Sequence, residues 1–262
     1  MAFIQCSFHS DVLGKACSMN VLLPQKVTTQ IGMTSSGGRS EFPVLYLLHG
    51  LSDDHSIWMR RTSIERYAAS YPLAIVMPDG GRSFYTDMKY GAKYWTFLSE
   101  ELPEIVSSLF PVSRRREDTF AAGLSMGGYG ALKLGLRCPE KFAAVAGMSS
   151  VTDYLGFLHM LAERDENGRD EALRFFGTLD NIPANEDLFE LARLTAQKTV
   201  KPRVFQCCGT EDMLYDMNIR FRDMMAGLPF DYTYHEAPGI HCWEFWDFWI
   251  QEILKWLPLE EK

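Results

Sequence analysis

The stretch Thr119–Gly130 (TFAAGLSMGGYG) constrains the fold of this 262-residue chain more than any other stretch. An apolar run leads into Gly123-x-Ser125-x-Gly127, and a helical pattern begins directly after it. This is the pattern of a nucleophile elbow, a tight strand-to-helix turn that lifts a serine hydroxyl above a sheet. Glycines are needed on both sides of the serine because side chains there would clash. The alternative is an ordinary turn that happens to contain Gly, Ser and Gly. The flanking strand and helix, and the order of the partner residues below, favour the elbow.

The same alternation of strand and helix extends along most of the chain. Apolar runs typical of strands covered on both faces lie at 43–50, 73–78, 119–123, 143–147 and 203–208. Helical patterns occur at about 61–70, 94–110, 127–137 and 216–227, and a last strand at 230–235 precedes a final helix at about 242–257. Two more strands, 2–9 and 17–24, form a predicted antiparallel pair at one edge. We therefore predict an α/β fold with a mostly parallel eight-stranded sheet and helices on both faces.

Residues 152–200 interrupt this alternation. They contain short helical patterns at 169–176 and 186–196, separated by Gly, Asn and Pro. In a sheet of this kind an insertion lies above the carboxyl ends of the strands, where ligands bind. We therefore predict one α/β domain over residues 1–262 with a small cap insertion at about 152–200, which we call the cap segment.

A serine hydroxyl needs a base within hydrogen-bond reach and an acid that orients this base. On this architecture the chain order is serine, acid, histidine, with each residue in a loop after a strand. Of the six histidines, His241 follows the last strand in a Pro/Gly loop that leads into the final helix, so it is the predicted base. Asp212 directly follows a buried strand and is the predicted acid. The alternatives are helix capping for both residues, and Glu211 or Asp216 as the acid.

The oxyanion of a tetrahedral intermediate needs two converging N–H donors, each lowering the barrier by roughly 3 kcal/mol. The N–H of Met126 begins the helix after the serine and is the first candidate. The second donor is expected in the loop Gly50–Ser52, after the third strand, and we place it on Leu51. His49 is predicted to stabilise this loop and not to react.

Composition argues against several other functions. The formal net charge is −8 and the one basic cluster, Arg114–Arg116, is short, so nucleic acid is not an expected partner. The chain shows no signal peptide and no run of roughly 18 apolar residues, so no membrane partner is expected. The six cysteines have no C-x-x-C spacing, which predicts reduced thiols and a cytoplasmic location. Asp53-Asp54-His55 lacks any further ligand pattern, so no metal is expected.

Several motifs resemble those of the esterase D superfamily. They are Leu47–Ser52 (LLHGLS), Ser83–Asp87 (SFYTD), Glu100–Pro103 (EELP), Gly123–Ala131 (GLSMGGYGA) and Cys208–Asp212 (CGTED). S-formylglutathione hydrolases, tributyrin esterases of Gram-positive bacteria, and some feruloyl and acetyl-xylan esterases belong to this superfamily. The short chain and the loop Ser52–Trp58 (SDDHSIW) look closest to the tributyrin esterases. The resemblance spans nearly the whole chain and is weakest at 25–40 and in the cap segment.

The resemblance implies an α/β-hydrolase fold without a cofactor. It also implies that Trp58 and Tyr85 lie near the substrate pocket, and that the chain forms dimers or tetramers, as members of the family often do. The site residues that it implies are those assigned above: the triad Ser125, Asp212 and His241, and the oxyanion donors Leu51 and Met126.

The sequence thus predicts a serine carboxylesterase that hydrolyses short-chain acyl esters through an acyl-enzyme intermediate, with a small-molecule ester as its partner. Feruloyl esters or acetylated xylan are one alternative, encouraged by the aromatic residues around the site. The thioester S-formylglutathione is another. Acyl transfer to a sugar, as in mycolyltransferase relatives, is disfavoured because no export signal is evident. A non-catalytic binding module is disfavoured because all three triad residues are present.

Overall fold

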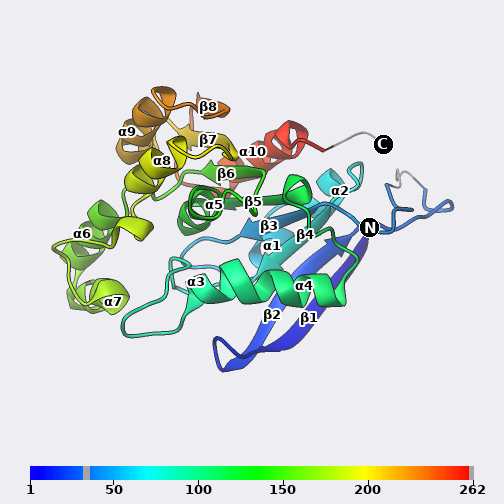
Figure 1. The fold of residues 1–262 in the computed structure, drawn as a ribbon, viewed down its shortest axis with the longest axis horizontal. Coiled ribbons are helices and arrows are strands. Elements are labelled where there is room, and N and C mark those ends of the chain that lie inside the picture. The colour runs from blue at the N-terminus through cyan, green and yellow to red at the C-terminus, as the bar shows by residue number, and fades with distance from the viewer. Residues whose placement is uncertain (32–35, 260–262) are drawn as a thin grey trace.

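An eight-stranded sheet runs through the centre of the computed structural model, which describes residues 1–31 and 36–259 (Figure 1). The strands lie in the order β1-β2-β4-β3-β5-β6-β7-β8. Strand β2 is antiparallel to both β1 and β4, and the other neighbouring strands are parallel. The predicted sheet, mostly parallel with an antiparallel pair at one edge, is confirmed. The strands are β1 (Ala2–Ser10), β2 (Lys15–Leu23), β3 (Val44–Leu48), β4 (Ala74–Pro78), β5 (Thr119–Leu124), β6 (Ala144–Met148), β7 (Arg203–Gly209) and β8 (Tyr232–Ala237).

The α-helices of the described residues include three that agree with the predicted ranges to within one residue at each end, namely α5, α9 and α10. The helix predicted at 61–70 is divided into α1 and α2, because Thr62 between them has an extended backbone. None of the helices in the described part of the chain is both long and apolar enough to cross a bilayer. The helices are α1 (Ile57–Arg61), α2 (Ile64–Ala68), α3 (Tyr94–Thr96), α4 (Leu102–Leu109), α5 (Met126–Arg137), α6 (Tyr154–Arg164), α7 (Glu166–Phe176), α8 (Leu188–Ala196), α9 (Tyr215–Ala226) and α10 (Trp243–Trp256).

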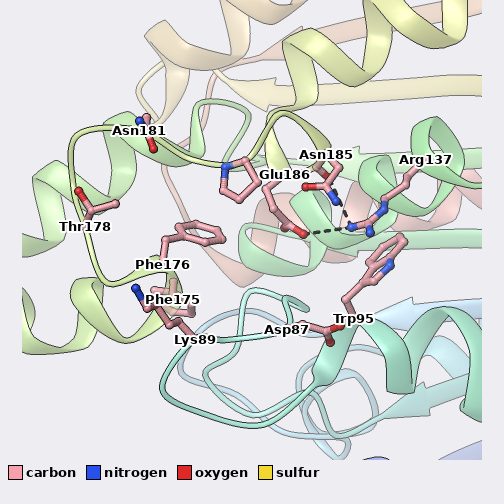
Figure 2. A pocket seen from close by; sticks show the side chains of 11 residues that line it. Asp87, Lys89, Trp95, Arg137, Phe175, Phe176, Thr178, Asn181, Asn185 and Glu186 are labelled. Carbon is pink, nitrogen blue, oxygen red and sulfur yellow. Dashed lines mark hydrogen bonds and ion pairs between the residues drawn. The ribbon is translucent and has the colours of Figure 1, made fainter.

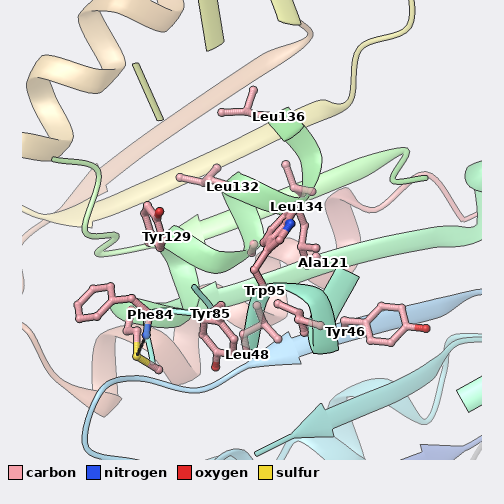
Figure 3. Packing of buried hydrophobic residues seen from close by; sticks show 14 of the residues in the cluster. Tyr46, Leu48, Phe84, Tyr85, Trp95, Ala121, Tyr129, Leu132, Leu134 and Leu136 are labelled. Carbon is pink, nitrogen blue, oxygen red and sulfur yellow. Dashed lines mark hydrogen bonds between the residues drawn. The ribbon is translucent and has the colours of Figure 1, made fainter. Parts of the chain in front are cut away.

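Alternating side chains of the strands pack into two apolar clusters, one on each face of the sheet. In β3, Val44, Tyr46 and Leu48 join one cluster, and Leu45 and Leu47 join the other, as the two-residue period of a strand requires. The first cluster is covered by α4, α5, α8 and α9, and the second by α1, α2 and α10. Figure 3 shows the first cluster where side chains of β3 and β5 meet those of α5. Helices therefore cover both faces, as predicted.

The segment predicted as one helix at 94–110 contains a widened turn. Helix α3 is followed by a π-helical turn, Phe97–Glu101, and then by α4. Pro103 explains the change, because proline has no N–H to donate to the carbonyl four residues earlier, that of Ser99. This carbonyl accepts a hydrogen bond from Lys141 Nζ at 3.0 Å instead.

The cap segment contains α6, α7 and α8, of which α6 was not predicted. Asp153 caps α6, and its side chain accepts a hydrogen bond from the Gly156 N–H at 2.8 Å. The buried residues of this helix, Tyr154, Leu158 and Leu161, recur at helical spacing. The signal was therefore present in the sequence, as an aspartate N-cap followed by an apolar stripe.

A buried carboxylate fastens the cap segment to α5. Glu186 Oε2 accepts hydrogen bonds from Lys133 Nζ at 2.6 Å and from Tyr129 Oη at 2.9 Å, and its Oε1 accepts one from Arg137 Nη1 at 3.1 Å. The Lys133 side chain is fully buried. Burial lowers the pKa of Lys133, and the neighbouring Glu186 opposes this shift. Figure 2 shows Glu186 and Arg137 beside a cavity of about 450 Å³ that the cap segment shares with the main body.

Replacing Glu186 with alanine is expected to lower the free energy of unfolding by about 3–5 kcal/mol, because it leaves the buried ammonium of Lys133 without its counter-ion. Urea unfolding followed by circular dichroism measures this loss. The matched control is Glu190→Ala on α8, which removes an exposed ion pair with Arg193 and is expected to cost less than about 1 kcal/mol. Equal losses in the two variants would show that Glu186 is not an anchor.

Candidate active site

Ser125 occupies the turn between β5 and α5 with a strained backbone. Its φ of 53° and ψ of −118° lie in a region that residues other than glycine rarely adopt. The flanking glycines make the turn possible. A Cβ on Gly123 would lie 2.4 Å from the carbonyl carbon of Gly127, and a Cβ on Gly127 would lie 2.4 Å from the carbonyl oxygen of Leu48. The turn therefore has the geometry of a nucleophile elbow.

His241 and Asp212 are joined by a hydrogen bond. His241 Nδ1 lies 3.0 Å from Asp212 Oδ1 and 2.9 Å from Oδ2. A carboxylate can only accept, so the imidazole proton resides on Nδ1 and the lone pair on Nε2. The Asp212 side chain is fully buried, and its Oδ1 also accepts a hydrogen bond from the Leu214 N–H at 2.8 Å. A carboxylate held in this way fixes both the tautomer and the orientation of the ring.

The loops that carry Asp212 and His241 are tied to each other. The Glu211 N–H donates to the Gly239 carbonyl at 3.0 Å, and the Gly239 N–H donates to Glu211 Oε2 at 2.6 Å. This second bond lowers the pKa of Glu211. The loops also touch at Gly209, where a Cβ would lie 2.2 Å from the Gly239 carbonyl oxygen. Glu211, one of the alternative acids, therefore holds the His241 loop in place.

Ser125 and His241 face a common cavity of about 650 Å³. The imidazole of His241 packs edge-to-face on Trp246, with 4.8 Å between the ring centroids. The cap segment supplies part of the cavity wall through α6. Other lining residues are Leu51 from the loop after β3, Phe157 and Arg164 from α6, and Trp243 and Trp246 from α10.

The two predicted oxyanion donors belong to segments next to Ser125. Met126 is the first residue of α5, so its N–H has no acceptor within the helix. Leu51 follows Gly50, and a Cβ on Gly50 would lie only 3.8 Å from the Cβ of Ser125. The peptide between Gly50 and Leu51 therefore runs beside the serine.

Four consecutive carbonyl groups at the end of β3 each accept a hydrogen bond from a side chain. We call residues 48–51 the 48–51 loop. Such bonds contribute roughly 0.5–1.5 kcal/mol each, and four in a row fix the orientation of every peptide in the loop. The bonds are Trp58 Nε1 to the Leu48 carbonyl (3.1 Å), Tyr85 Oη to that of His49 (3.0 Å), His49 Nδ1 to that of Gly50 (2.7 Å) and Arg82 Nη1 to that of Leu51 (3.3 Å).

Trp58 and Tyr85 lie behind the cavity, although they were predicted to lie at the substrate pocket. Their exposed fractions are 0 % and 1 %, and neither is among the residues that line the cavity beside Ser125. Burial raises the pKa of Tyr85 well above its usual value, so its hydroxyl stays protonated and donates. The structure therefore corrects the prediction: both side chains support the 48–51 loop from the core.

His49 sets the direction of the Gly50–Leu51 peptide. The Gly80 N–H donates to His49 Nε2 at 2.8 Å, so the imidazole proton is on Nδ1, which donates to the Gly50 carbonyl. In a trans peptide the carbonyl and the following N–H point in opposite directions. The Leu51 N–H therefore points away from His49. His49 stabilises the loop, as predicted, through its bond to the Gly50 carbonyl.

Sequence reasoning did not single out Arg82 or Trp246 as residues of the site. Arg82 follows two glycines after β4. A polar residue in a loop after a buried strand is a signal for a site residue, and this signal could have identified Arg82. Trp246 lies in the aromatic last helix, where it is buried and also lines the cavity.

The carboxyl ends of parallel strands are where α/β-hydrolases carry their chemistry, and here the loops after β5 and β8 bring Ser125 and a carboxylate-bound His241 to one cavity. The fold and the site thus place the protein among the serine hydrolases of the α/β-hydrolase fold.

Comparison with known proteins identifies the family. The family model described as "Putative esterase" matches residues 10–257, so the chain belongs to this esterase family. A curated acetyl esterase of Caldicellulosiruptor saccharolyticus is 30% identical, with 98% of each chain covered. The substrate-bound structure of fluorophosphonate-binding serine hydrolase F of Staphylococcus aureus is 31% identical and covers 99% of each chain, with a TM-score of 0.85. The apoenzyme structure of an S-formylglutathione hydrolase of the same organism is 32% identical and covers 98% of each chain, with a TM-score of 0.83.

These matches confirm the resemblance to the esterase family and the α/β-hydrolase fold. The protein is accordingly a carboxylic ester hydrolase. The closer likeness to tributyrin esterases stays a prediction.

Proposed function

We propose that the protein is a serine esterase that hydrolyses short-chain acyl esters through an acyl-enzyme intermediate. Ser125 Oγ attacks the ester carbonyl while His241 Nε2 takes the hydroxyl proton, and a C–O bond forms as the carbonyl becomes an oxyanion. The single observation that carries this proposal is the bond from His241 Nδ1 to the buried Asp212, since it leaves the Nε2 lone pair available beside the cavity that contains Ser125.

The intermediate then breaks down in two stages. His241 returns its proton to the leaving alcohol oxygen as the ester C–O bond breaks, and the acyl group stays on Ser125. Water next attacks the acyl carbon while His241 takes one of its protons, which passes to Ser125 Oγ when the carboxylic acid leaves. The N–H groups of Leu51 and Met126 hold the oxyanion in both stages.

Short acyl groups are the favoured substrates. The acetyl esterase relative supports this choice, because it aligns with nearly all of this chain. The cavity of about 650 Å³ also has Trp243 and Trp246 in its wall, so feruloyl esters or acetylated xylan remain second candidates. S-formylglutathione is a third candidate, supported by the likeness to the staphylococcal hydrolase of that name.

The six cysteines are free thiols in the structure, which supports the proposal that the enzyme works in a reducing compartment such as the cytoplasm. A dimer or tetramer stays a proposal that light scattering tests.

Labelling with a fluorophosphonate probe, followed by peptide mass spectrometry, tests the proposed chemistry. We expect one label per chain, on Ser125, and a burst of p-nitrophenol when the enzyme meets p-nitrophenyl acetate. A panel of acetyl, butyryl and feruloyl esters with S-formylglutathione then ranks the substrates by kcat/KM. Labelling of a different residue would contradict the assignment of the nucleophile.

A further inference from the structure

Arg82 lies between two groups that are far apart in the sequence. Its Nη1 donates to the Leu51 carbonyl at 3.3 Å, whereas its Nε and Nη2 donate to Glu171 Oε1 and Oε2 at 2.7 Å and 2.8 Å. Glu171 belongs to α7 of the cap segment. A bidentate ion pair fixes the plane of the guanidinium. The position of α7 therefore determines where the remaining N–H groups of Arg82 can meet Leu51.

Arg82 faces two cavities. It lines the cavity of about 650 Å³ that contains Ser125, and with Glu171 it also lines a neighbouring cavity of about 430 Å³ under α7. A molecule that enters either cavity therefore meets the guanidinium.

Arg82 differs from the other three donors to the 48–51 loop. Trp58, Tyr85 and His49 are buried, with exposed fractions of 1 % or less. The Arg82 side chain is 49 % exposed, and its hydrogen bond to the loop is the longest of the four. Of these four donors, Arg82 is the one that also forms an ion pair with a residue of the cap segment. The first three bonds are thus built into the core, and the fourth depends on where the cap segment lies.

We propose that Arg82 is a positioning residue that couples α7 to the oxyanion site. This inference rests on the proposed function, in which the Leu51 N–H binds the oxyanion. While Arg82 is paired with Glu171, it holds the Leu51 carbonyl and limits the motion of the adjoining Gly50–Leu51 peptide. When the pair is broken, the loop loses one of its four donors, and the Leu51 N–H loses part of its preorganisation toward the reacting carbonyl. Binding of a substrate at the cap segment therefore changes kcat through Arg82.

Arg82→Met tests the coupling, because it keeps the aliphatic part of the side chain and removes both interactions. We expect kcat for p-nitrophenyl butyrate to fall roughly tenfold with KM changed less than about twofold, the pattern of an interaction made in the transition state. The fall is smaller than the about 10²–10³-fold cost of losing an oxyanion donor itself. Glu171→Gln, which keeps an acceptor for Arg82, is expected to lower kcat about threefold.

Arg164→Met is the matched control. Arg164 lines the same cavity, but its ion pair is with Asp165 inside the cap segment. This variant therefore measures the effect of removing one positive charge from the cavity wall without altering the 48–51 loop. The affinity for a trifluoromethyl ketone, whose adduct with the serine carries an oxyanion, should weaken in parallel with kcat in Arg82→Met, and by more than it does in Arg164→Met.

Two results would overturn the inference: equal kcat values for the two methionine variants, or a raised KM with an unchanged kcat in Arg82→Met, which would make Arg82 a substrate ligand. If thermal unfolding shows that Arg82→Met is misfolded, Arg82→Lys replaces it, because it keeps the charge and loses the bidentate pair. Fluorophosphonate labelling separates this inference from the proposed function. If the wild type is not labelled at Ser125, the proposed function is contradicted. If the wild type is labelled normally and Arg82→Met has an unchanged kcat, only the coupling is contradicted.

Discussion

Ser125→Ala is expected to lower kcat for p-nitrophenyl acetate on the order of 10⁶-fold, because it removes the atom that forms the acyl bond. KM should change little, since the cavity keeps its shape and lacks only one hydroxyl. The backbone of alanine is no less strained than that of serine at this position, so thermal unfolding should occur at nearly the same temperature. Steady-state kinetics with purified protein, together with loss of fluorophosphonate labelling, measure the effect.

A second serine supplies the control for this experiment. Ser52 lines the same cavity, so Ser52→Ala removes a hydroxyl from the site without touching the elbow. Labelling at residue 125 should persist in that variant. Full turnover by Ser125→Ala, or loss of labelling in Ser52→Ala alone, would refute the assignment of the nucleophile.

Asp212→Asn is expected to lower kcat about 10⁴-fold with little change in fold. An asparagine amide can donate to His241 Nδ1, which moves the imidazole proton to Nε2. Nε2 then has no lone pair with which to accept the Ser125 proton. Steady-state rates with a short-chain ester measure the loss, and circular dichroism checks the fold.

The rival acid provides the comparison for Asp212. Asp216 is exposed on α9, and Asp216→Asn is expected to keep activity close to that of the wild type. If Asp216→Asn loses activity and Asp212→Asn does not, the acid has been assigned to the wrong residue.

The parts of the site that could be predicted from the sequence are those with a local cause. The elbow is largely such a part, because a Cβ on Gly123 would clash with Gly127 four residues later, although glycine at 127 is required by the Leu48 carbonyl of β3. The meeting of Ser125, Asp212 and His241 follows from the parallel strands, whose carboxyl ends lie at one edge of the sheet. Continuous apolar runs in β3 and its neighbours likewise identified the sheet and both covered faces.

The parts that could not be predicted depend on contacts between distant residues. Arg82 and Glu171 are 89 positions apart, and Lys133 and Glu186 are 53 positions apart. No periodicity in the sequence pairs such charges. Trp58 illustrates a second limit of prediction from sequence. A motif can place a residue near a site, but it does not give the direction of the side chain. Only the packing of α1 against the sheet turns it into the core, where it bonds to the Leu48 carbonyl.

The left-handed backbone of Ser125 has a consequence for how this protein can change over evolutionary time. Glycine would relax that conformation, but it would also delete the hydroxyl, so the position cannot be improved for folding and for turnover at once. Two backbone hydrogen bonds to neighbouring elements offset the strain at Ser125. The Ser125 N–H donates to the Met148 carbonyl at 2.9 Å, and the Tyr129 N–H donates to the Ser125 carbonyl at 3.0 Å. Substitutions that loosen β6 or the first turn of α5 would therefore threaten catalysis before they threaten the fold.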